Sequence, residues 1–290
     1  SSAIGGVINI ISKSADFTDD FQIHGDLYGR YGTNDVENLE AFNVRISDTR
    51  FSLSAGITRQ EISDYRGASE GRLSPSGFNA FGGYVNLAFR PSEGHTFRLS
   101  YVTNERTDVE SYVQSRINAG NVPRFFSPIE RRGILKLQYT AEDLGAWSKE
   151  LQIYGYYHYY DEERETRSVS ATRFNNTLRD QNQDVLGAGI QNITELGGAT
   201  RLIYGVDYRH QKLNSSNRLT SRDLETGVGT RTQPAGNTPD GYYDVFSTFI
   251  SSEFRPMEFL MLTAGVRYEH TNLQSQPTGL DVIPDAGYTL

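Results

Sequence analysis

An alternation of apolar and polar side chains with a period of two residues recurs along almost the whole chain, and it constrains the possible folds more than any other feature. In the clearest segments, residues 21–31, 81–90, 201–209 and 260–269, the apolar face carries no charged residue at 20 positions, whereas the opposite face carries eight at 20. A period of two is typical of β-strands, because successive side chains leave opposite faces. One face of each predicted strand therefore meets surroundings that exclude charge.

A weaker alternation predicts further strands at residues 38–47, 50–60, 96–105, 132–141, 149–160, 185–194 and 242–254. The chain is thus expected to form about eleven strands, each of about ten residues or more. Strands of globular proteins usually have about five or six residues, whereas a tilted strand that crosses a bilayer needs about nine to eleven. The strand length therefore favours a membrane-spanning sheet.

The connections between the predicted strands alternate in length. Short connections are expected at residues 47–49, 91–94, 142–148, 195–198 and 255–258, and long ones at 61–78, 106–131, 161–184 and 212–241, with a smaller one at 32–37. Seven of the nine prolines fall in these connections or at their edges, and Pro277 and Pro284 fall in a further long loop after residue 269, so no predicted strand interior loses a hydrogen-bond donor. Short turns at one end and long loops at the other are typical of outer-membrane barrels.

These patterns together predict an all-β fold, an antiparallel transmembrane β-barrel. A soluble β-sandwich also explains the alternation, but it predicts strands of about half this length and no regular rhythm of short and long connections. Tyrosines and phenylalanines crowd residues 154–160 and 242–254. Amphipathic rings are favoured where hydrocarbon meets headgroups, although ordinary cross-strand aromatic pairs also explain them.

The composition argues against several classes of function. With 28 basic and 36 acidic side chains, a net charge of −8 does not suit a nucleic-acid binder, which needs clustered Lys and Arg. The absence of cysteine from the sequence excludes disulfides, thiolate zinc sites and cysteine nucleophiles within it. No apolar stretch approaches the roughly 18 residues that a spanning helix needs. The sequence opens without a charged and then apolar leader, so we expect it to begin inside a mature chain.

The first thirteen residues, SSAIGGVINIISK, form a short apolar segment hinged at Gly5 and Gly6. This stretch resembles the end of the plug domain of TonB-dependent outer-membrane receptors, which closes with a sequence of the form SAIGGVINIIT-K. Residues 204–208 (YGVDY) and 265–269 (GVRYE) also resemble recurring phrases in the barrel strands of these receptors. The likeness extends over essentially the whole chain, with its sharpest motif at residues 1–13.

The resemblance implies a barrel of twenty-two strands with a globular plug in its lumen, of which this chain would supply about half. The expected domains are residues 1–13 as the C-terminal end of the plug, residues 14–20 as a linker, and residues 21–290 as the N-terminal half of the barrel. We therefore expect a piece of a longer protein located in the bacterial outer membrane.

The function that the resemblance implies is TonB-dependent active import of a scarce nutrient, with an iron-siderophore or haem as the expected cargo. The expected partners are the TonB complex, reached through an N-terminal region outside this sequence, the outer-membrane lipid, and a small-molecule ligand; nucleic acid is not expected. The alternatives are a passive porin, a receptor for cobalamin or an oligosaccharide, and a soluble carbohydrate-binding or structural β-protein.

Enzymatic chemistry is not expected. The sequence contains no nucleophile elbow, no P-loop and no His-Glu-x-x-His pair, and it predicts neither a cofactor nor a metal site. The five histidines lie on separate predicted strands or turns, and the phase of the alternation directs His24 and His158 to the polar side of the wall.

The long connection at residues 106–131 is the candidate ligand-binding segment, because binding residues favour loops held on a rigid scaffold. It combines aromatic rings with guanidinium groups, which suits an anionic or aromatic ligand such as a ferric chelate or a porphyrin with propionates. The candidate ligand-binding residues are Tyr112, Arg116, Arg124, Phe125 and Phe126.

Overall fold

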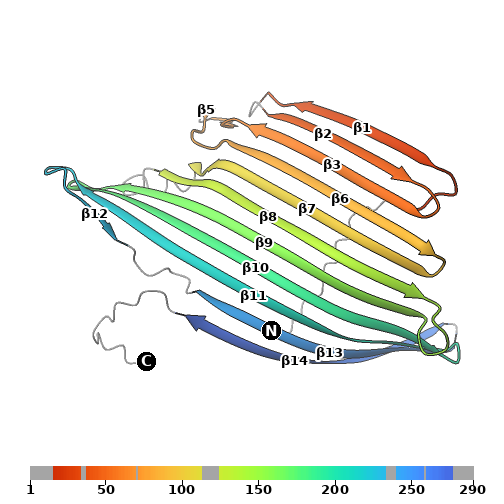
Figure 1. Cartoon of the computed structure of the whole chain (residues 1–290). Coiled ribbons are helices and arrows are strands. Elements are labelled where there is room, and N and C mark those ends of the chain that lie inside the picture. The colour runs from red at the N-terminus through yellow and green to blue at the C-terminus, as the bar shows by residue number, and fades with distance from the viewer. Residues whose placement is uncertain are drawn as a thin grey trace.

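A computed structural model describes residues 16–33, 37–69, 71–112, 124–232, 240–257 and 259–276. The ordered elements in these ranges are β-strands, most of them long and antiparallel (Figure 1). The strands are β1 (Gln22–Tyr31), β2 (Asn38–Ser47), β3 (Phe51–Ile62), β4 (Arg66–Gly67), β5 (Gly71–Arg72), β6 (Phe78–Ser92), β7 (His95–Glu110), β8 (Arg124–Glu142), β9 (Glu150–Val169), β10 (Arg173–Leu196), β11 (Thr200–Asp223), β12 (Gly229–Thr232), β13 (Asp240–Met257) and β14 (Leu260–Gln276). The described part of the chain has no helix that is long and apolar enough to cross a membrane.

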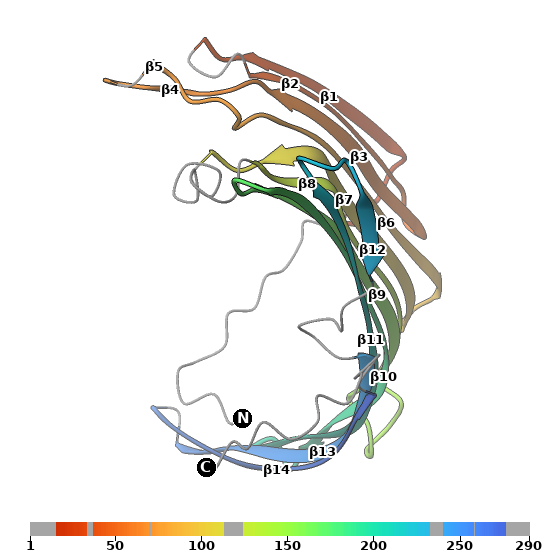
Figure 2. The same ribbon diagram turned by 90° about the vertical axis from the view of Figure 1, so that its left-hand side faces the viewer.

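The main sheet joins its strands in the order β1-β2-β3-β6-β7-β8-β9-β10-β11-β13-β14, so each long strand pairs only with its neighbours in the sequence. The expectation of about eleven long strands in an antiparallel sheet is therefore confirmed. Short β12 pairs with the loop end of β11, and β4 pairs with β5 in a separate hairpin. The sheet curves into an open half-barrel wall whose edges are β1 and β14 (Figure 2).

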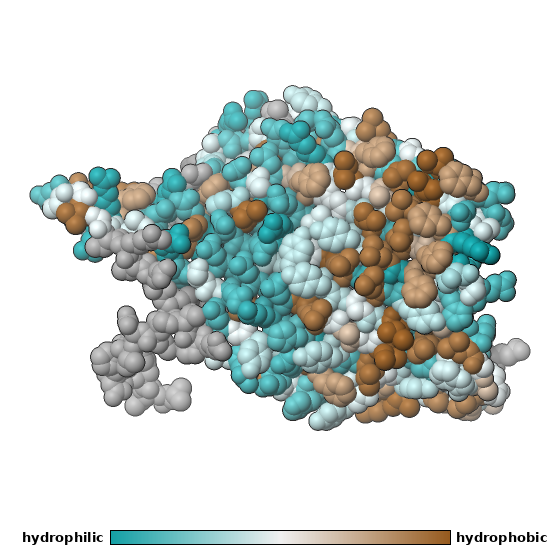
Figure 3. Space-filling model, in the orientation of Figure 1, coloured by the Kyte–Doolittle hydropathy of each residue, from teal (hydrophilic) through white to brown (hydrophobic). Residues whose placement is uncertain are grey.

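The strand register places the four predicted apolar faces on one side of the wall. Leu27 pairs with Phe42, Phe42 pairs with Ile57, and the same phase continues across the sheet to Val206, Thr248 and Tyr268. This side is convex, and its hydrophobic residues gather toward the short-turn ends of the strands (Figures 2 and 3). We call this surface the apolar band.

The apolar band is exposed rather than covered by protein. Leu27 is 83% exposed, Val206 41% and Leu262 52%. Within the described ranges, no second sheet and no helix lies over these side chains. A soluble sandwich would bury such a face, so the structure contradicts the sandwich alternative.

The expected long connections at residues 106–131, 161–184 and 212–241 are wrong in large part. Strand β8 already begins at Arg124, and β9 and β10 continue to a short connection at residues 170–172. Strand β11 extends to Asp223 before the chain turns into β12. These parts carry polar residues on both faces, so the period of two disappears from the hydropathy although the backbone pairing continues.

Three prolines also lie inside observed strands rather than in the connections where they were expected. Pro91, Pro128 and Pro256 each fall at an irregularity of the register, between Phe89 and Ser92, Phe126 and Ile129, and Phe254 and Met257, respectively. A β-bulge tolerates proline because the ladder already lacks a regular donor at that point. The bulges therefore explain how these strands continue past a proline.

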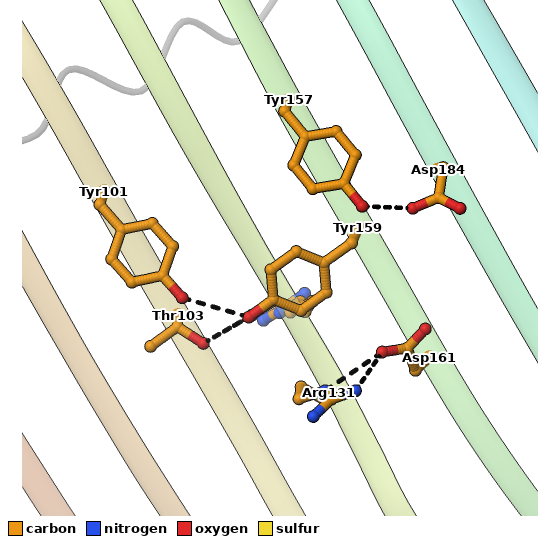
Figure 4. Close-up of polar contacts among 8 residues, drawn as sticks. Tyr101, Thr103, Arg131, Tyr157, Tyr159, Asp161 and Asp184 are labelled. Atoms are coloured by element: carbon orange, nitrogen blue, oxygen red, sulfur yellow. Dashed lines mark hydrogen bonds and ion pairs between the residues drawn. The ribbon is translucent and has the colours of Figure 1, made fainter.

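The register places polar and aromatic side chains at the loop-side border of the apolar band. Figure 4 shows the contacts that they make across the strands. The Tyr159 hydroxyl lies 3.0 Å from the hydroxyl of Thr103 and 3.3 Å from that of Tyr101. The ring of Tyr159 crosses over Gly133, where a Cβ atom would lie 2.6 Å from the ring carbons. The Tyr157 hydroxyl donates to Asp184 at 2.5 Å. We call this border the tyrosine rim; its assignment to the headgroup level remains a prediction.

Candidate functional site

The structure places the predicted ligand-binding residues at the loop ends of β7 and β8. Tyr112 follows β7, and Phe125 and Phe126 are among the first residues of β8, which starts at Arg124. The backbone N–H of Ser111 donates to the carbonyl of Phe125 at 3.2 Å, which joins the two ends of this connection. Arg116 lies outside the described residues.

Phe125 and Phe126 are adjacent residues of one strand, so their side chains leave opposite faces of the wall. Phe125 pairs with Thr166 and shares the concave face, whereas Phe126 pairs with Glu165 on the convex face. One guanidinium that lies over the ring of Phe125 belongs to Arg164 of β9, whose Cζ atom lies 5.0 Å from the ring centroid. Phe125 and Phe126 therefore face opposite sides of the wall, and the joint role of the five residues in ligand binding stays a prediction.

A pocket of about 310 Å³ lies in the loop-side part of the wall, on β7, β8 and β9. It is lined by Asn104, Arg106, Glu130, Arg131, Arg132 and Tyr160. We call it the arginine pocket. Its position on the concave face means that a solute inside the barrel would reach it.

The register explains why these residues meet. Asn104 pairs with Arg132, and Arg132 pairs with Tyr160, which forms one row across β7, β8 and β9. Arg106 pairs with Glu130 one step closer to the loops, and this row continues to Glu162. Side chains directly opposite each other on one face lie about 5 Å apart at their Cβ atoms, so the two rows form a continuous patch.

Several contacts fix the walls of the arginine pocket. The Tyr160 hydroxyl donates to Glu162 at 3.0 Å, and Glu162 also forms an ion pair with Arg164. Arg106 lies over the ring of Phe78, with its Cζ atom 5.4 Å from the ring centroid. Glu162 is therefore paired with Arg164, and Arg131, which lies on the convex phase of β8, is paired with Asp161. On the concave face the pocket is left with two arginines, Arg106 and Arg132, and one carboxylate, Glu130. This arrangement favours a ligand that carries negative charge.

Sequence reasoning missed Asn104, Arg106, Arg132 and Tyr160 as site residues. Asn104 and Arg132 were placed in predicted strands without a role, Tyr160 was counted among the crowded aromatic residues, and Arg106 was assigned to a loop. The alternation could have grouped them, because Asn104 and Arg106 continue the concave phase of β7. The pairing of this strand with β8, which is needed to bring Arg132 beside Asn104, is not visible in the sequence.

A second polar group lies deeper on the concave face, on β11, β13 and β14. The Arg267 guanidinium donates to Asp207 at 3.1 Å and to Ser247 at 2.6 Å. Its Cζ atom also lies 5.8 Å from the ring centroid of Phe249. These residues satisfy one another, so they form a structural brace across three strands.

The histidines occupy five different strands, as expected: β1, β7, β9, β11 and β14. The register places His24 opposite Arg45 and His158 opposite Val185, both on the concave face. In the part of the chain that the structure describes, no group of three His, Cys, Asp or Glu side chains could hold a metal ion.

Comparison with known proteins gives the class. Residues 103–289 match the family described as "TonB dependent receptor-like, beta-barrel", which is more than half of the chain. The chain therefore belongs to the TonB-dependent receptors, and the resemblance to this family that the sequence shows is confirmed. Searches of the curated proteins found no match.

Solved structures agree on the fold. The copper transporter OprC matches over 90% of this chain with a TM-score of 0.69 and 14% identity. The ferric citrate transporter FecA in its unliganded form matches over 92% with a TM-score of 0.55 and 18% identity. The siderophore receptor PiuA from Acinetobacter baumannii matches over 94% with a TM-score of 0.54 and 12% identity. The chain spans only 38%, 40% and 49% of these three proteins, respectively.

Proposed function

We propose that this chain is part of an energy-coupled importer of the bacterial outer membrane, which takes up a scarce nutrient as an anionic iron chelate. Membership of the TonB-dependent receptors supports the class, and the uncovered apolar band supports a position in a bilayer. The observation that carries the cargo class is the arginine pocket on the concave face. The proposed role is binding and transport without covalent chemistry.

The arginine pocket supports an anionic ligand because of where its charges lie. Arg106 and Arg132 occupy the concave phase on adjacent strands, and in the described ranges neither guanidinium has a carboxylate partner within ion-pair distance. The planar guanidinium of an arginine can donate two parallel hydrogen bonds to one carboxylate. The nearby rings of Phe78 and Phe125 add apolar faces. A ferric siderophore or a haem with propionates combines these properties.

The proposed domain arrangement follows the family. Residues 1–13 would close the plug, residues 14–20 would link it to the wall, and residues 21–290 would form the first half of the barrel. The TonB complex would supply the energy for opening the plug, and outer-membrane lipid would surround the apolar band. Residues 1–15 lie outside the described residues, so these boundaries remain proposals.

A growth assay tests the cargo. A strain that lacks the full-length receptor would be grown on single iron sources, namely defined ferric siderophores and haem, and separately on limiting cobalamin. We expect growth to require the receptor on one anionic iron chelate and to require TonB as well. Receptor-dependent growth that persists without TonB would instead support a passive porin, and rescue on cobalamin or an oligosaccharide alone would contradict the iron proposal.

Variants then test the pocket. Replacing Arg106 and Arg132 together by glutamine should weaken ligand binding by about tenfold to a hundredfold per lost charged hydrogen bond, equivalent to about 1.5–3 kcal/mol each. Arg59→Gln is the matched control, because Arg59 lies on the convex face of β3 and is well exposed. Equal losses in both variants would show that the pocket does not bind the ligand.

A further inference from the structure

A hollow of about 490 Å³ interrupts the apolar band over β10, β11, β13 and β14. Its apolar lining includes Ile190, Val206, Ile250 and Val266, and Tyr268 closes one side. All of these side chains share the convex phase of the register. The hollow therefore opens toward the surface that the proposed function places against hydrocarbon.

The floor of the hollow is formed by Thr248, whose side chain is smaller than those of its neighbours on the same face. Thr248 lies between Phe246 and Ile250 on the convex face of β13, and it pairs with Val206 on one side and with Tyr268 on the other. The Thr248 hydroxyl donates to the carbonyl of Gly205 at 3.2 Å. This bond turns the hydroxyl toward the backbone and satisfies it there, so Thr248 adds no unpartnered polar group to the floor.

The short-turn end of the hollow is polar and rigid. Asn192 and Tyr204 line it, and the Asn192 amide donates to the Tyr204 hydroxyl at 2.8 Å. The same amide nitrogen donates to the carbonyl of Trp147 at 3.1 Å, and the hydroxyl of Ser148 donates to the Asn192 oxygen at 2.5 Å. The connection between β8 and β9 is thereby fastened to the end of the hollow.

This fastened connection presents the only tryptophan of the sequence to the surroundings. Ser148 is fully buried, whereas Trp147 is 58% exposed. An indole ring combines an apolar body with an N–H donor, and it is favoured at the boundary between hydrocarbon and headgroups. The hollow has an apolar end inside the band and a polar end at Asn192, and this polar end is joined to the Trp147 connection through the backbone carbonyl of Trp147.

We propose that the hollow and this connection together bind one glycerophospholipid of the leaflet on the short-turn side, with an acyl chain in the hollow and the glycerol-phosphate end at the Trp147 connection. The inference rests on the membrane position proposed above. The hollow is continuous with the apolar band, so at this depth a hydrocarbon chain is the available occupant. The bound lipid would extend the smooth outer surface of the wall across the gap above Thr248.

Native mass spectrometry tests the proposal on the full-length receptor, delipidated in detergent and titrated with phosphatidylethanolamine. We expect one adduct that saturates in the wild type and in Thr248→Val, which keeps the size of the side chain. Thr248→Phe should fill the hollow and reduce the adduct at least tenfold. Phe246 and Phe254 already occupy the same face of β13, so a phenylalanine suits this strand.

A second readout locates the polar end. Phosphatidylethanolamine with brominated acyl chains should quench the fluorescence of Trp147, taken as the difference between the wild type and Trp147→Phe. We expect saturable quenching at about one lipid per protein in the wild type and its loss in Thr248→Phe. Quenching that rises without saturation, or an undiminished adduct in Thr248→Phe, would overturn the site. If the receptor instead stays monodisperse without detergent, the membrane position fails and not only the lipid site.

Discussion

The two halves of the long strands β9, β10 and β11 differ in their side chains while their backbone is the same. On the convex face of β10, the half next to the short turn carries Leu186 and Ile190, whereas the loop half carries Asp180, Asn182 and Asp184. The ladder with β9 and β11 continues through both halves without interruption. The change from an apolar to a polar convex face along the wall is therefore encoded by side chains alone.

The loop halves also use a different kind of cross-strand contact. Arg131 donates to Asp161 at 2.7 Å between β8 and β9. Asp244 of β13 accepts from the Tyr208 hydroxyl at 2.6 Å and contacts Nδ1 of His210 at 2.8 Å. Polar pairs of this type suit water and headgroups, while the apolar band suits hydrocarbon. The comparison teaches that one continuous sheet can present an apolar surface over one half of its strands and a polar surface over the other.

The largest expected difference in stability is between two variants that place an arginine in the turn-side half and in the loop-side half of β11. Val206→Arg should destabilise the assembled protein by about 2–4 kcal/mol, because the side chain would enter the middle of the band. Ser216→Arg lies on the same face in the loop half, where Asp180 is a neighbour, and should change stability by less than about 0.5 kcal/mol. Unfolding in lipid vesicles measures both variants, and equal costs would refute the division of the strand.

A substitution in the tyrosine rim should lower the stability of the protein less than Val206→Arg does. Gly133→Val adds a Cβ atom that would lie 2.6 Å from the ring of Tyr159, so the ring must move away from Thr103. We expect a loss of about 1–2 kcal/mol, in the range of other overpacking substitutions. A double-mutant cycle with Tyr159→Ala supplies the control, because removal of the ring should abolish most of this cost. An unchanged cost in the double variant would place the strain in the backbone.

The ion pair between Arg131 and Asp161 should contribute still less to stability. Asp161→Asn removes the partner of Arg131, whose side chain is half-exposed. Exposed pairs contribute about 0.2–1 kcal/mol and are screened by salt. We expect a loss in this range at low ionic strength that shrinks at high ionic strength. A loss that is independent of salt would indicate that the pair is shielded from water.

The smallest effect is expected in the turn between β11 and β12. The backbone N–H of Thr226, its hydroxyl and the N–H of Glu225 hold the pKa of the Asp223 carboxyl below its usual value. A lowered folded-state pKa means that this carboxylate favours the folded turn above its unfolded pKa, and that the benefit is lost as the pH falls through the folded pKa. The carboxyl chemical shift of Asp223 should report this titration, and Thr226→Ala should move the midpoint upward. An unchanged midpoint would exclude the hydroxyl as a cause.

The halves of the strands next to the short turns could be predicted from the sequence, because one of their faces is apolar and the other is polar. Residues 38–47 were expected as a strand and match β2 at both ends. The loop halves could not, because a segment such as residues 173–184 carries polar residues on both faces and so lacks the apolar alternation. There the strand is held by backbone pairing with β9 and β11, which leaves little trace in hydropathy.

The candidate site was harder to predict for a related reason. One guanidinium over the Phe125 ring belongs to Arg164, which comes from β9 and was not among the predicted residues. Likewise, Arg132 reaches Asn104 through the register of β7 and β8. Residue types can be read along one strand, whereas a binding surface runs across strands and depends on their alignment.

The strand order of the wall has a consequence for how the protein can grow. Because each long strand pairs only with the strands before and after it in the chain, an exposed edge is always the template for the next hairpin. No segment must be threaded between strands that have already joined. Assembly can therefore advance one hairpin at a time, and the circumference of such a barrel can be changed by inserting or deleting whole hairpins without rewiring the remainder.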